Sequence, residues 1–185
     1  MLMERDRSVL VLVDHQARLM PAILGGASVL DAAVLLAEAA HALGVPVLGT
    51  AQNPAALGPL DAQLAARCAV VLPKTHFSAV PDGLIPALQA HAPRRPAILL
   101  AGCETHVCLL QTALDLHATG AEVTVVADAC GSRRAEDKAL ALQRLSRAGV
   151  GLVSAEMVVY EWLRTCTDPA FRTVLAQVKA RGTAG

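Results

Sequence analysis

Aromatic residues are scarce in this sequence of 185 residues, of which they make up 2%. Proteins that bind single-stranded nucleic acid stack bases on aromatic side chains, so this scarcity argues against that function. Neither sign of charge is in excess, because 16 Lys and Arg residues balance 16 Asp and Glu residues. We therefore expect no global field that draws the protein to nucleic acid or to an anionic membrane.

The sequence also has no apolar run of the roughly 20 residues that a helix needs to span a bilayer. Its first residues, MLMERDRSVL, pass from charged residues straight into a short apolar segment, which is typical of neither a signal peptide nor a membrane anchor. The five cysteines are odd in number and form no disulfide framework. We therefore expect a reducing, cytoplasmic setting and no membrane partner.

Apolar residues are abundant, at 54%, and are arranged in a repeated pattern. Short β-branched apolar runs alternate with amphipathic segments, which predicts one domain over residues 1–185 with an α/β fold. The expected architecture is a three-layer α/β/α sandwich whose six-stranded parallel sheet has the assumed order 3-2-1-4-5-6. The expected strands cover residues 9–13, 45–48, 69–72, 97–101, 122–127 and 150–153.

Several residues are expected to begin helices because their side chains can accept a hydrogen bond from a free backbone N–H group. These N-cap residues are Ser28, Thr105, Ser132 and Ser154. A further helix over 81–91 is expected to be broken at Pro86. The helix over 155–163 carries apolar residues on too many sides for one buried face, so we expect part of it to contact another subunit.

Polar residues follow four of the expected strands. Asp14 follows the first strand, Gln52 and Asn53 the second, Lys74 the third, and Cys108 lies shortly after the fourth. Ligands bind outside the carboxyl ends of parallel strands, where the strand order reverses. The assumed order makes the first and fourth strands neighbours there, which predicts that Asp14 lies close to Cys108.

Cys108 allows two interpretations. If Thr105 caps the helix, the sulfur lies in its first turn, where the positive end of the dipole favours a thiolate and free N–H groups can bind an oxyanion. A free cysteine is also commonly a small buried hydrophobic residue. Its position alone does not separate the two.

Lys74 and Asp14 also allow two interpretations each when they are considered alone. The chain has only three lysines, so Lys74 after a strand could hold a thiolate or a carboxylate by its charge, but it could also be an ordinary solvated residue. Asp14 ends an apolar strand either as a cap for the next turn or as a general base beside a cation.

Four segments together resemble the isochorismatase-like cysteine hydrolases. They are VLVDHQARL, PKTHFSA, AGCETHVCLLQTALDL and VVADACGSR, in the family's order and spread over nearly the whole chain. The resemblance implies that Asp14 is a general acid and base, Lys74 the cation between aspartate and thiol, and Cys108 the nucleophile. It also implies a cis peptide between His106 and Val107, which would direct the Val107 and Cys108 N–H groups into an oxyanion hole.

The segment TAQNPAALGPL resembles a subgroup of small hydrolases of poorly defined substrate, and it departs from the subgroup's usual pattern at Asn53 and Ala55. The substrate contacts that we expect are Gln52, Asn53, Phe77 and Thr105. Related nicotinamidases carry an aspartate and histidines for zinc on this stretch, and TAQNP has neither. We therefore predict no metal and no other cofactor.

The reaction that these residues favour is cleavage of a small amide through a thioester on Cys108. A covalent thiol has no role in hydrolysing the vinyl ether of isochorismate, so that reaction is the alternative within the family. A non-catalytic binding or assembly module on the same fold is the alternative outside it. Proteins of the family that the sequence resembles form oligomers, so we expect a homo-oligomer. Its expected partner is a small-molecule substrate.

Overall fold

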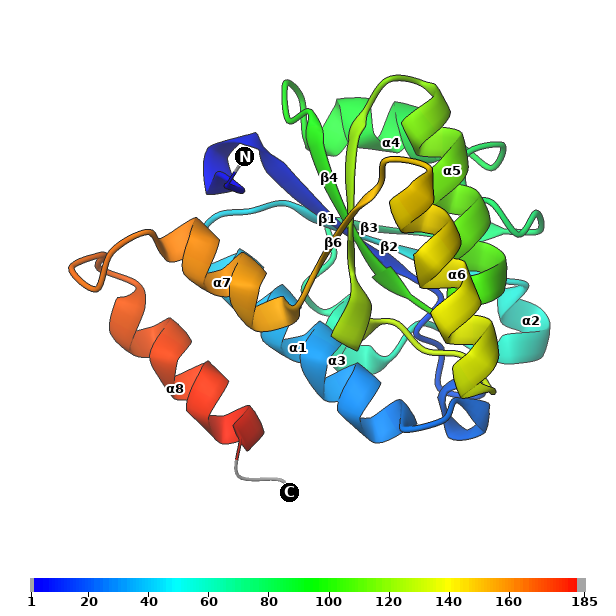
Figure 1. Cartoon of the computed structure of the whole chain (residues 1–185), viewed down its shortest axis with the longest axis horizontal. Helices are drawn as coiled ribbons and strands as arrows, with labels where there is room; N and C mark the ends of the chain where they lie inside the picture. Colours follow the sequence, from blue (N-terminus) through cyan, green and yellow to red (C-terminus); the bar gives the residue numbers. More distant parts are fainter. Residues whose placement is uncertain (1, 183–185) are drawn as a thin grey trace.

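The computed structural model describes residues 2–182 and contains one parallel sheet of six strands (Figure 1). The strand order β3-β2-β1-β4-β5-β6 is the predicted order. The strands are β1 Ser8–Val13, β2 Val47–Gln52, β3 Val70–Lys74, β4 Ala97–Gly102, β5 Glu122–Val126 and β6 Gly151–Val153. Strands β1 and β4 lie at the reversal of order, so the chain segments that follow them start side by side.

Helices cover both faces of the sheet, which confirms the three-layer α/β fold (Figure 1). Strand β1 shows why: Leu10 and Leu12 point into one apolar cluster, and Val9, Val11 and Val13 into the other. The first cluster includes residues of α1 Gly26–Ala42, α3 Ala62–Ala65, α7 Ala155–Leu163 and α8 Phe171–Gly182. The second includes residues of α4 Leu84–His91, α5 Leu110–Ala118 and α6 Ala135–Arg147.

The shorter helical segments lie in the connections between these elements. They are the helix α2 Pro54–Leu57, the π-helical turn Thr105–Leu109 before α5, and the 3-10 turns Arg5–Arg7, Met20–Ala22 and Ala127–Ala129. No helix within residues 2–182 is long and apolar enough to cross a membrane.

The structure confirms one predicted helix start and corrects others. Ser154 caps α7, because its Oγ accepts a hydrogen bond from the Met157 N–H group. Helix α1 begins at Gly26, ahead of the predicted Ser28, and α4 begins at Leu84 and is unbroken because Pro86 falls in its first turn. Helix α6 begins at Ala135 and is not capped by Ser132, whose hydroxyl bonds to His106 instead.

Helix α7 is mostly covered by the chain's own core. Its buried residues are Ala155, Val158, Val159, Trp162 and Leu163. Trp162 also donates from Nε1 to Ser8 Oγ at 3.0 Å, which satisfies its one polar atom. Only Met157 and Tyr160, one turn apart, expose large apolar surfaces on this helix. The face available to another subunit is therefore narrower than the sequence pattern suggested.

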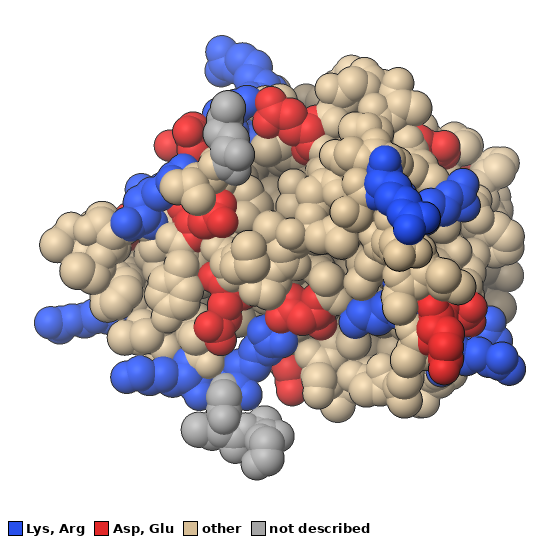
Figure 2. Space-filling view, in the orientation of Figure 1, with Lys and Arg blue, Asp and Glu red and all other residues tan. Residues whose placement is uncertain are grey.

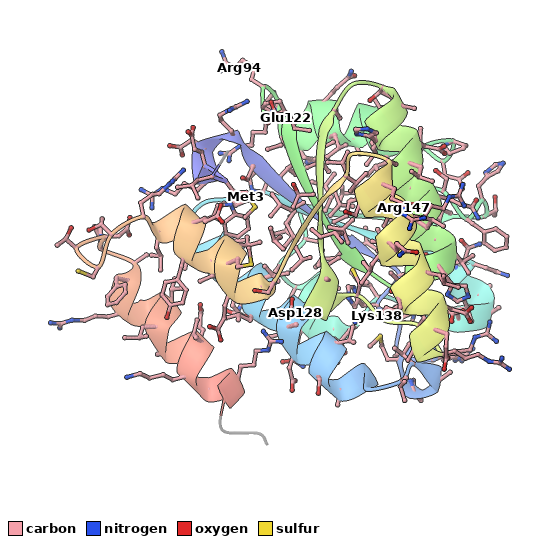
Figure 3. The ribbon with its side chains drawn as sticks, in the orientation of Figure 1. Met3, Arg94, Glu122, Asp128, Lys138 and Arg147 are labelled. Atoms are coloured by element: carbon pink, nitrogen blue, oxygen red, sulfur yellow. The ribbon has the colours of Figure 1, made fainter. Side chains whose placement is uncertain are left out.

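Asp128, labelled in Figure 3, links the end of β5 to the last two helices. Its Oδ1 accepts from the first N–H group of α7, on Ala155, at 2.8 Å, and its Oδ2 pairs with Arg181 of α8 at 3.0 Å. Helix α8 is thus held on the same face of the sheet as α1 and α7.

Gly102 allows β4 to approach β1 closely at the edge where the site forms. A Cβ atom at this position would lie 2.4 Å from the Val13 carbonyl oxygen and 2.6 Å from Val13 Cβ. Any larger residue would push the two strands apart. The glycine therefore keeps Asp14, which follows Val13, next to the turn that follows β4.

Candidate functional site

Four side chains meet at the carboxyl edge of the sheet, each at or just beyond the end of a different strand. Asp14 follows β1 in a left-handed backbone conformation with φ 55°, Gln52 ends β2, Lys74 ends β3, and Cys108 lies in the turn after β4. Aspartate tolerates this conformation better than most residues. The structure thus brings together the three residues predicted as a triad, and it places Gln52 beside them.

Asp14 is fully buried, and its two carboxylate oxygens have different surroundings. Oδ1 accepts a hydrogen bond of 2.7 Å from Thr50 Oγ1. Oδ2 lies 2.7 Å from Lys74 Nζ as an ion pair, and the carboxylate also interacts with the Cys108 thiol. Oδ2 therefore has a lone pair available to a proton from a neighbouring group.

Lys74 is also fully buried, and it donates three hydrogen bonds. Its Nζ donates to Gln52 Oε1 at 2.5 Å, to the Phe77 carbonyl at 2.9 Å and to the His76 carbonyl at 3.2 Å. An ammonium group has three N–H bonds, so these three acceptors and Asp14 Oδ2, which lies 2.7 Å away, share them. Together with the Asp14 carboxylate they compensate the buried charge.

The loop that supplies the two carbonyl groups is anchored by Asp82. Its Oδ2 accepts from the N–H groups of Thr75 and His76, and its Oδ1 lies 3.0 Å from His76 Nδ1. The hydrogen bond from the His76 N–H group is the main cause of the lowered pKa of Asp82. Phe77 thus contacts Lys74 through its backbone, while its ring, predicted as a pocket wall, is 53% exposed.

Cys108 lies against both members of the ion pair. Its Sγ is 3.9 Å from Gln52 Oε1, within the range of a hydrogen bond from a thiol. Burial, and then the charge of Asp14, raise the pKa of Cys108 to about 12, while Lys74 acts in the lowering direction. Burial and the carboxylate therefore act against the thiolate that the helix start was expected to favour. The site holds a thiol beside a base.

The turn that carries Cys108 also differs from the prediction. Its N-cap is Glu104, not Thr105, and the cis peptide joins Cys103 to Glu104, not His106 to Val107. His106 and Val107 lie inside the helical turn, where the hydrogen-bonded backbone needs trans peptides. The Val107 N–H group already donates to the Glu104 carbonyl at 3.0 Å, so Val107 does not fit the predicted role of oxyanion donor.

Residues 131–133, after β5, hold this turn from one side. The Thr105 N–H group donates to the Gly131 carbonyl at 2.8 Å, and the Arg133 N–H group to Glu104 Oε2 at 3.1 Å. His106 Nδ1 lies 3.0 Å from Ser132 Oγ. His106 is thus directed towards Ser132, while the buried Thr105 hydroxyl has no hydrogen-bond partner within residues 2–182.

Gln16 is a site residue that the sequence did not reveal. Its side chain is fully buried and pairs with the backbone of Gln52, accepting from the N–H group at 2.9 Å and donating to the carbonyl at 3.0 Å. Its position two residues after Asp14 was the only signal available. Asn53, predicted as a substrate contact, is exposed and donates from its backbone N–H group to the Lys74 carbonyl at 2.8 Å.

Residues 2–182 contain no group of three or more His, Cys, Asp or Glu side chains that could hold a metal ion. The lack of a metal or other cofactor stays a prediction.

Comparisons with known proteins identify the family to which this fold belongs. The model of the isochorismatase domain matches residues 8–157. The chain is 35% identical over 177 residues to isochorismatase domain-containing protein 2A of Mus musculus, which covers 94% of this chain and 84% of that protein. It is 38% identical to isochorismatase domain-containing protein 1 of Danio rerio, covering 93% of this chain and 61% of that protein.

Solved structures share the fold over almost the full length. The MAR1 ribonuclease of Caenorhabditis elegans matches with a TM-score of 0.89 and 28% identity, over 97% of this chain and 93% of that one. YcaC of Escherichia coli, an octameric hydrolase of unknown specificity, matches with a TM-score of 0.85 and 24% identity, over 97% and 88%. The extent of the domain match and the identity to these relatives show that the chain belongs to the isochorismatase family.

Proposed function

We propose that the protein is a cysteine hydrolase that cleaves the C–N bond of a small amide, with Cys108 as nucleophile, Asp14 as general base and acid, and Lys74 as the fixed positive charge. One observation carries the proposal: the buried Asp14 carboxylate lies beside the thiol, and its charge is balanced by Lys74 Nζ at 2.7 Å. A carboxylate in this position can accept the proton of a thiol that does not ionise by itself.

The first half of the reaction forms a thioester. The Cys108 proton passes to Asp14 Oδ2 as the sulfur attacks the amide carbon and forms a C–S bond. Backbone N–H groups at the start of the helix, with that of Cys108 among them, are the proposed donors to the oxyanion. Asp14 then returns the proton to the leaving nitrogen, the C–N bond breaks, and the amine departs.

The second half regenerates the thiol. Asp14 takes a proton from a water molecule, which attacks the thioester carbon. The C–S bond breaks, and the sulfur receives the proton from Asp14 as the carboxylic acid leaves. Lys74 keeps its charge throughout, because its three N–H bonds have acceptors and the Asp14 carboxylate lies next to it.

Gln52, Asn53, Phe77 and Thr105 remain the proposed substrate contacts, and they differ in access. The Phe77 ring and Asn53 are exposed at this edge, and Gln52 is partly exposed. Thr105 is buried with an unpartnered hydroxyl, so it fits a contact only if the turn around it shifts. No substrate is implied beyond a small amide.

The decisive experiment measures ammonia release from a panel of small primary amides by the wild type and by Cys108→Ala. Alanine removes only the thiol from a helical turn in which it is well tolerated, so the fold should persist. We expect turnover to disappear and the circular dichroism spectrum to stay the same. Wild-type turnover by Cys108→Ala would overturn the proposal.

Two other activities can be assayed separately with the same pair of proteins. Hydrolysis of the isochorismate ether is suggested by the family and does not need the thiol, so it would survive in Cys108→Ala. The name of the C. elegans relative suggests RNA cleavage. The balanced charge and the scarcity of aromatic residues in this chain argue against RNA as a substrate.

A further inference from the structure

The Gln52 carboxamide lies between the two groups that must cooperate in the proposed reaction. Its Oε1 accepts from Lys74 Nζ at 2.5 Å and is 3.9 Å from Cys108 Sγ. Its Nε2 donates to the Thr75 carbonyl at 2.8 Å, which fixes which end of the amide faces the ammonium. The same oxygen thus binds the ammonium and faces the thiol.

The two backbone acceptors of the ammonium are held in place. They are the His76 and Phe77 carbonyl groups, in the loop that Asp82 anchors through the N–H groups of Thr75 and His76. Neither carbonyl can leave Lys74 without moving this backbone. Of the two side-chain acceptors, Asp14 is also held by the Thr50 hydroxyl, whereas Gln52 can leave by rotating about its own bonds.

Because four acceptors lie within 3.2 Å of an ammonium with three N–H bonds, the Cys108 sulfur gains a full hydrogen bond from Lys74 only when one of them departs. A sulfur anion at Cys108 would be such an acceptor, and a charge-assisted hydrogen bond would stabilise it strongly at this buried position. In the resting arrangement Gln52 takes that bond, and Asp14 repels negative charge on the sulfur. The site thus keeps the thiol protonated.

We propose that Gln52 is a gate on the Lys74 ammonium: its carboxamide oxygen withholds one N–H bond in the resting site, and its rotation releases that bond to the Cys108 sulfur. This gate deepens the proposed function, because it links formation of the nucleophile to movement of a side chain at the mouth of the site. Gln16 acts with it as a positioning residue, since its buried amide fixes the backbone from which Gln52 rotates.

The groups that set the reactivity of the thiol are few. The titratable groups that act on Cys108 are Asp14, at the end of β1, and Lys74, at the end of β3. His15, next to Asp14, is buried with its pKa lowered to about 4, so it is neutral at assay pH and adds no charge. A change at Gln52 therefore acts on the thiol through Lys74 and Asp14.

The test uses two substitutions with opposite expected effects. Gln52→Leu removes the competing acceptor, so a Lys74 N–H bond is free for the sulfur; alkylation of Cys108 by iodoacetamide should become about tenfold faster at a fixed pH near 8. Gln52→Glu puts a second carboxylate on the ammonium and beside the sulfur; alkylation should become about tenfold slower. Rates are read by mass spectrometry of the peptide that contains Cys108, which separates it from the exposed Cys166.

The matched controls are Gln63→Leu and Gln63→Glu on the exposed surface of α3, where the same changes should leave the Cys108 rate unchanged. Gln52→Ala is a second neutral variant, included in case leucine disturbs the fold. Its Cys108 should also be alkylated faster than that of the wild type. A simple structural role would change the rate in one direction for all substitutions at Gln52. That result, or slower alkylation in both Gln52→Leu and Gln52→Ala, would overturn the gate.

The readout needs no amide turnover, so it separates the gate from the proposed function. Opposite rate changes at Gln52, together with normal turnover in Cys108→Ala, would retain the gate and remove the amidase proposal. The same rate change in both Gln52→Leu and Gln52→Glu, together with lost turnover in Cys108→Ala, would remove the gate and retain the amidase proposal.

Discussion

Asp14 and Lys74 form a salt bridge of 2.7 Å across a strand to which neither of them belongs. They extend from the ends of β1 and β3, and β2 lies between these strands in the sheet. Thr50 and Gln52 of β2 bond to the carboxylate and the ammonium respectively. The pair is therefore completed by a strand that supplies hydrogen bonds and no charge.

This burial makes the two charges depend on each other for stability. Lys74→Met keeps most of the apolar stem but leaves the Asp14 carboxylate unpaired, which should lower the free energy of unfolding by about 3–5 kcal/mol. Asp14→Asn should also be destabilising, and the double variant should lose much less than the sum of the two. Urea unfolding of all four proteins measures this coupling, and additive losses would show that the pair is not coupled.

His15 predicts a loss of stability in mild acid. Its ring is fully buried, Nε2 donates to the Ala129 carbonyl at 3.1 Å, and burial is the main cause that lowers its pKa from 6.5 to about 4. The unfolded chain therefore binds more protons than the folded one between these values, so stability falls as the pH drops below 6.5. The loss should approach about 3 kcal/mol once the pH reaches the lower value.

Urea unfolding as a function of pH tests this prediction on the variant His15→Gln, which keeps an N–H donor but does not titrate. We expect a flatter pH dependence than that of the wild type over the same window. The exposed His41→Gln is the control and should follow the wild type. An equal slope in His15→Gln would assign the pH dependence to other groups.

Ser132 should affect turnover through the turn that carries Cys108. Its buried hydroxyl lies 3.0 Å from His106 Nδ1, two residues before the nucleophile. Ser132→Ala removes this bond and should cost about 1–2 kcal/mol of stability. If the bond also positions the turn, kcat for the best amide should fall while KM changes little, and Ser132→Thr should recover kcat. The control is Ser146→Ala, at an exposed position of α6.

Assembly is expected to use the face over β6 and α7. Figure 2 shows that the centre of this face, between α6 and α7, carries few charged side chains. Met157 and Tyr160 expose apolar surface on α7. We expect light scattering at micromolar concentration to show an oligomer, and Met157→Glu with Tyr160→Glu to shift it to smaller species. Leu24→Glu, at an exposed leucine next to α6, is the control; a wild-type monomer would contradict the prediction.

Independence from metal is the remaining prediction. The proposed reaction needs no metal ion, because the thiol, the carboxylate and backbone N–H groups perform its steps. Amide turnover should survive exhaustive treatment with a chelator followed by gel filtration. Stoichiometric zinc in the purified protein, together with loss of turnover on its removal, would contradict this prediction.

Local sequence patterns were enough to predict the order of the elements along the chain and the edge of the sheet at which the site forms. Strands of four to six residues with β-branched side chains are a local property, and so is the position of a polar residue directly after a strand. Because all strands are parallel, their carboxyl ends meet at one edge. Asp14, Lys74 and Cys108 could therefore be placed near one another without any knowledge of their distances.

The hydrogen-bond partners of these residues depend on contacts between segments that are distant in the sequence. Thr50 reaches Asp14, and Gln16 reaches Gln52, across 36 residues of sequence in each case. These contacts depend on the register between β1 and β2, which pairs Val13 with Thr50 and which no local pattern encodes. The raised pKa of Cys108 has the same origin, because it comes from burial and from a neighbouring carboxylate. Local pattern fixes where a side chain leaves the backbone, whereas packing of distant segments fixes its neighbours, and the neighbours set its chemistry.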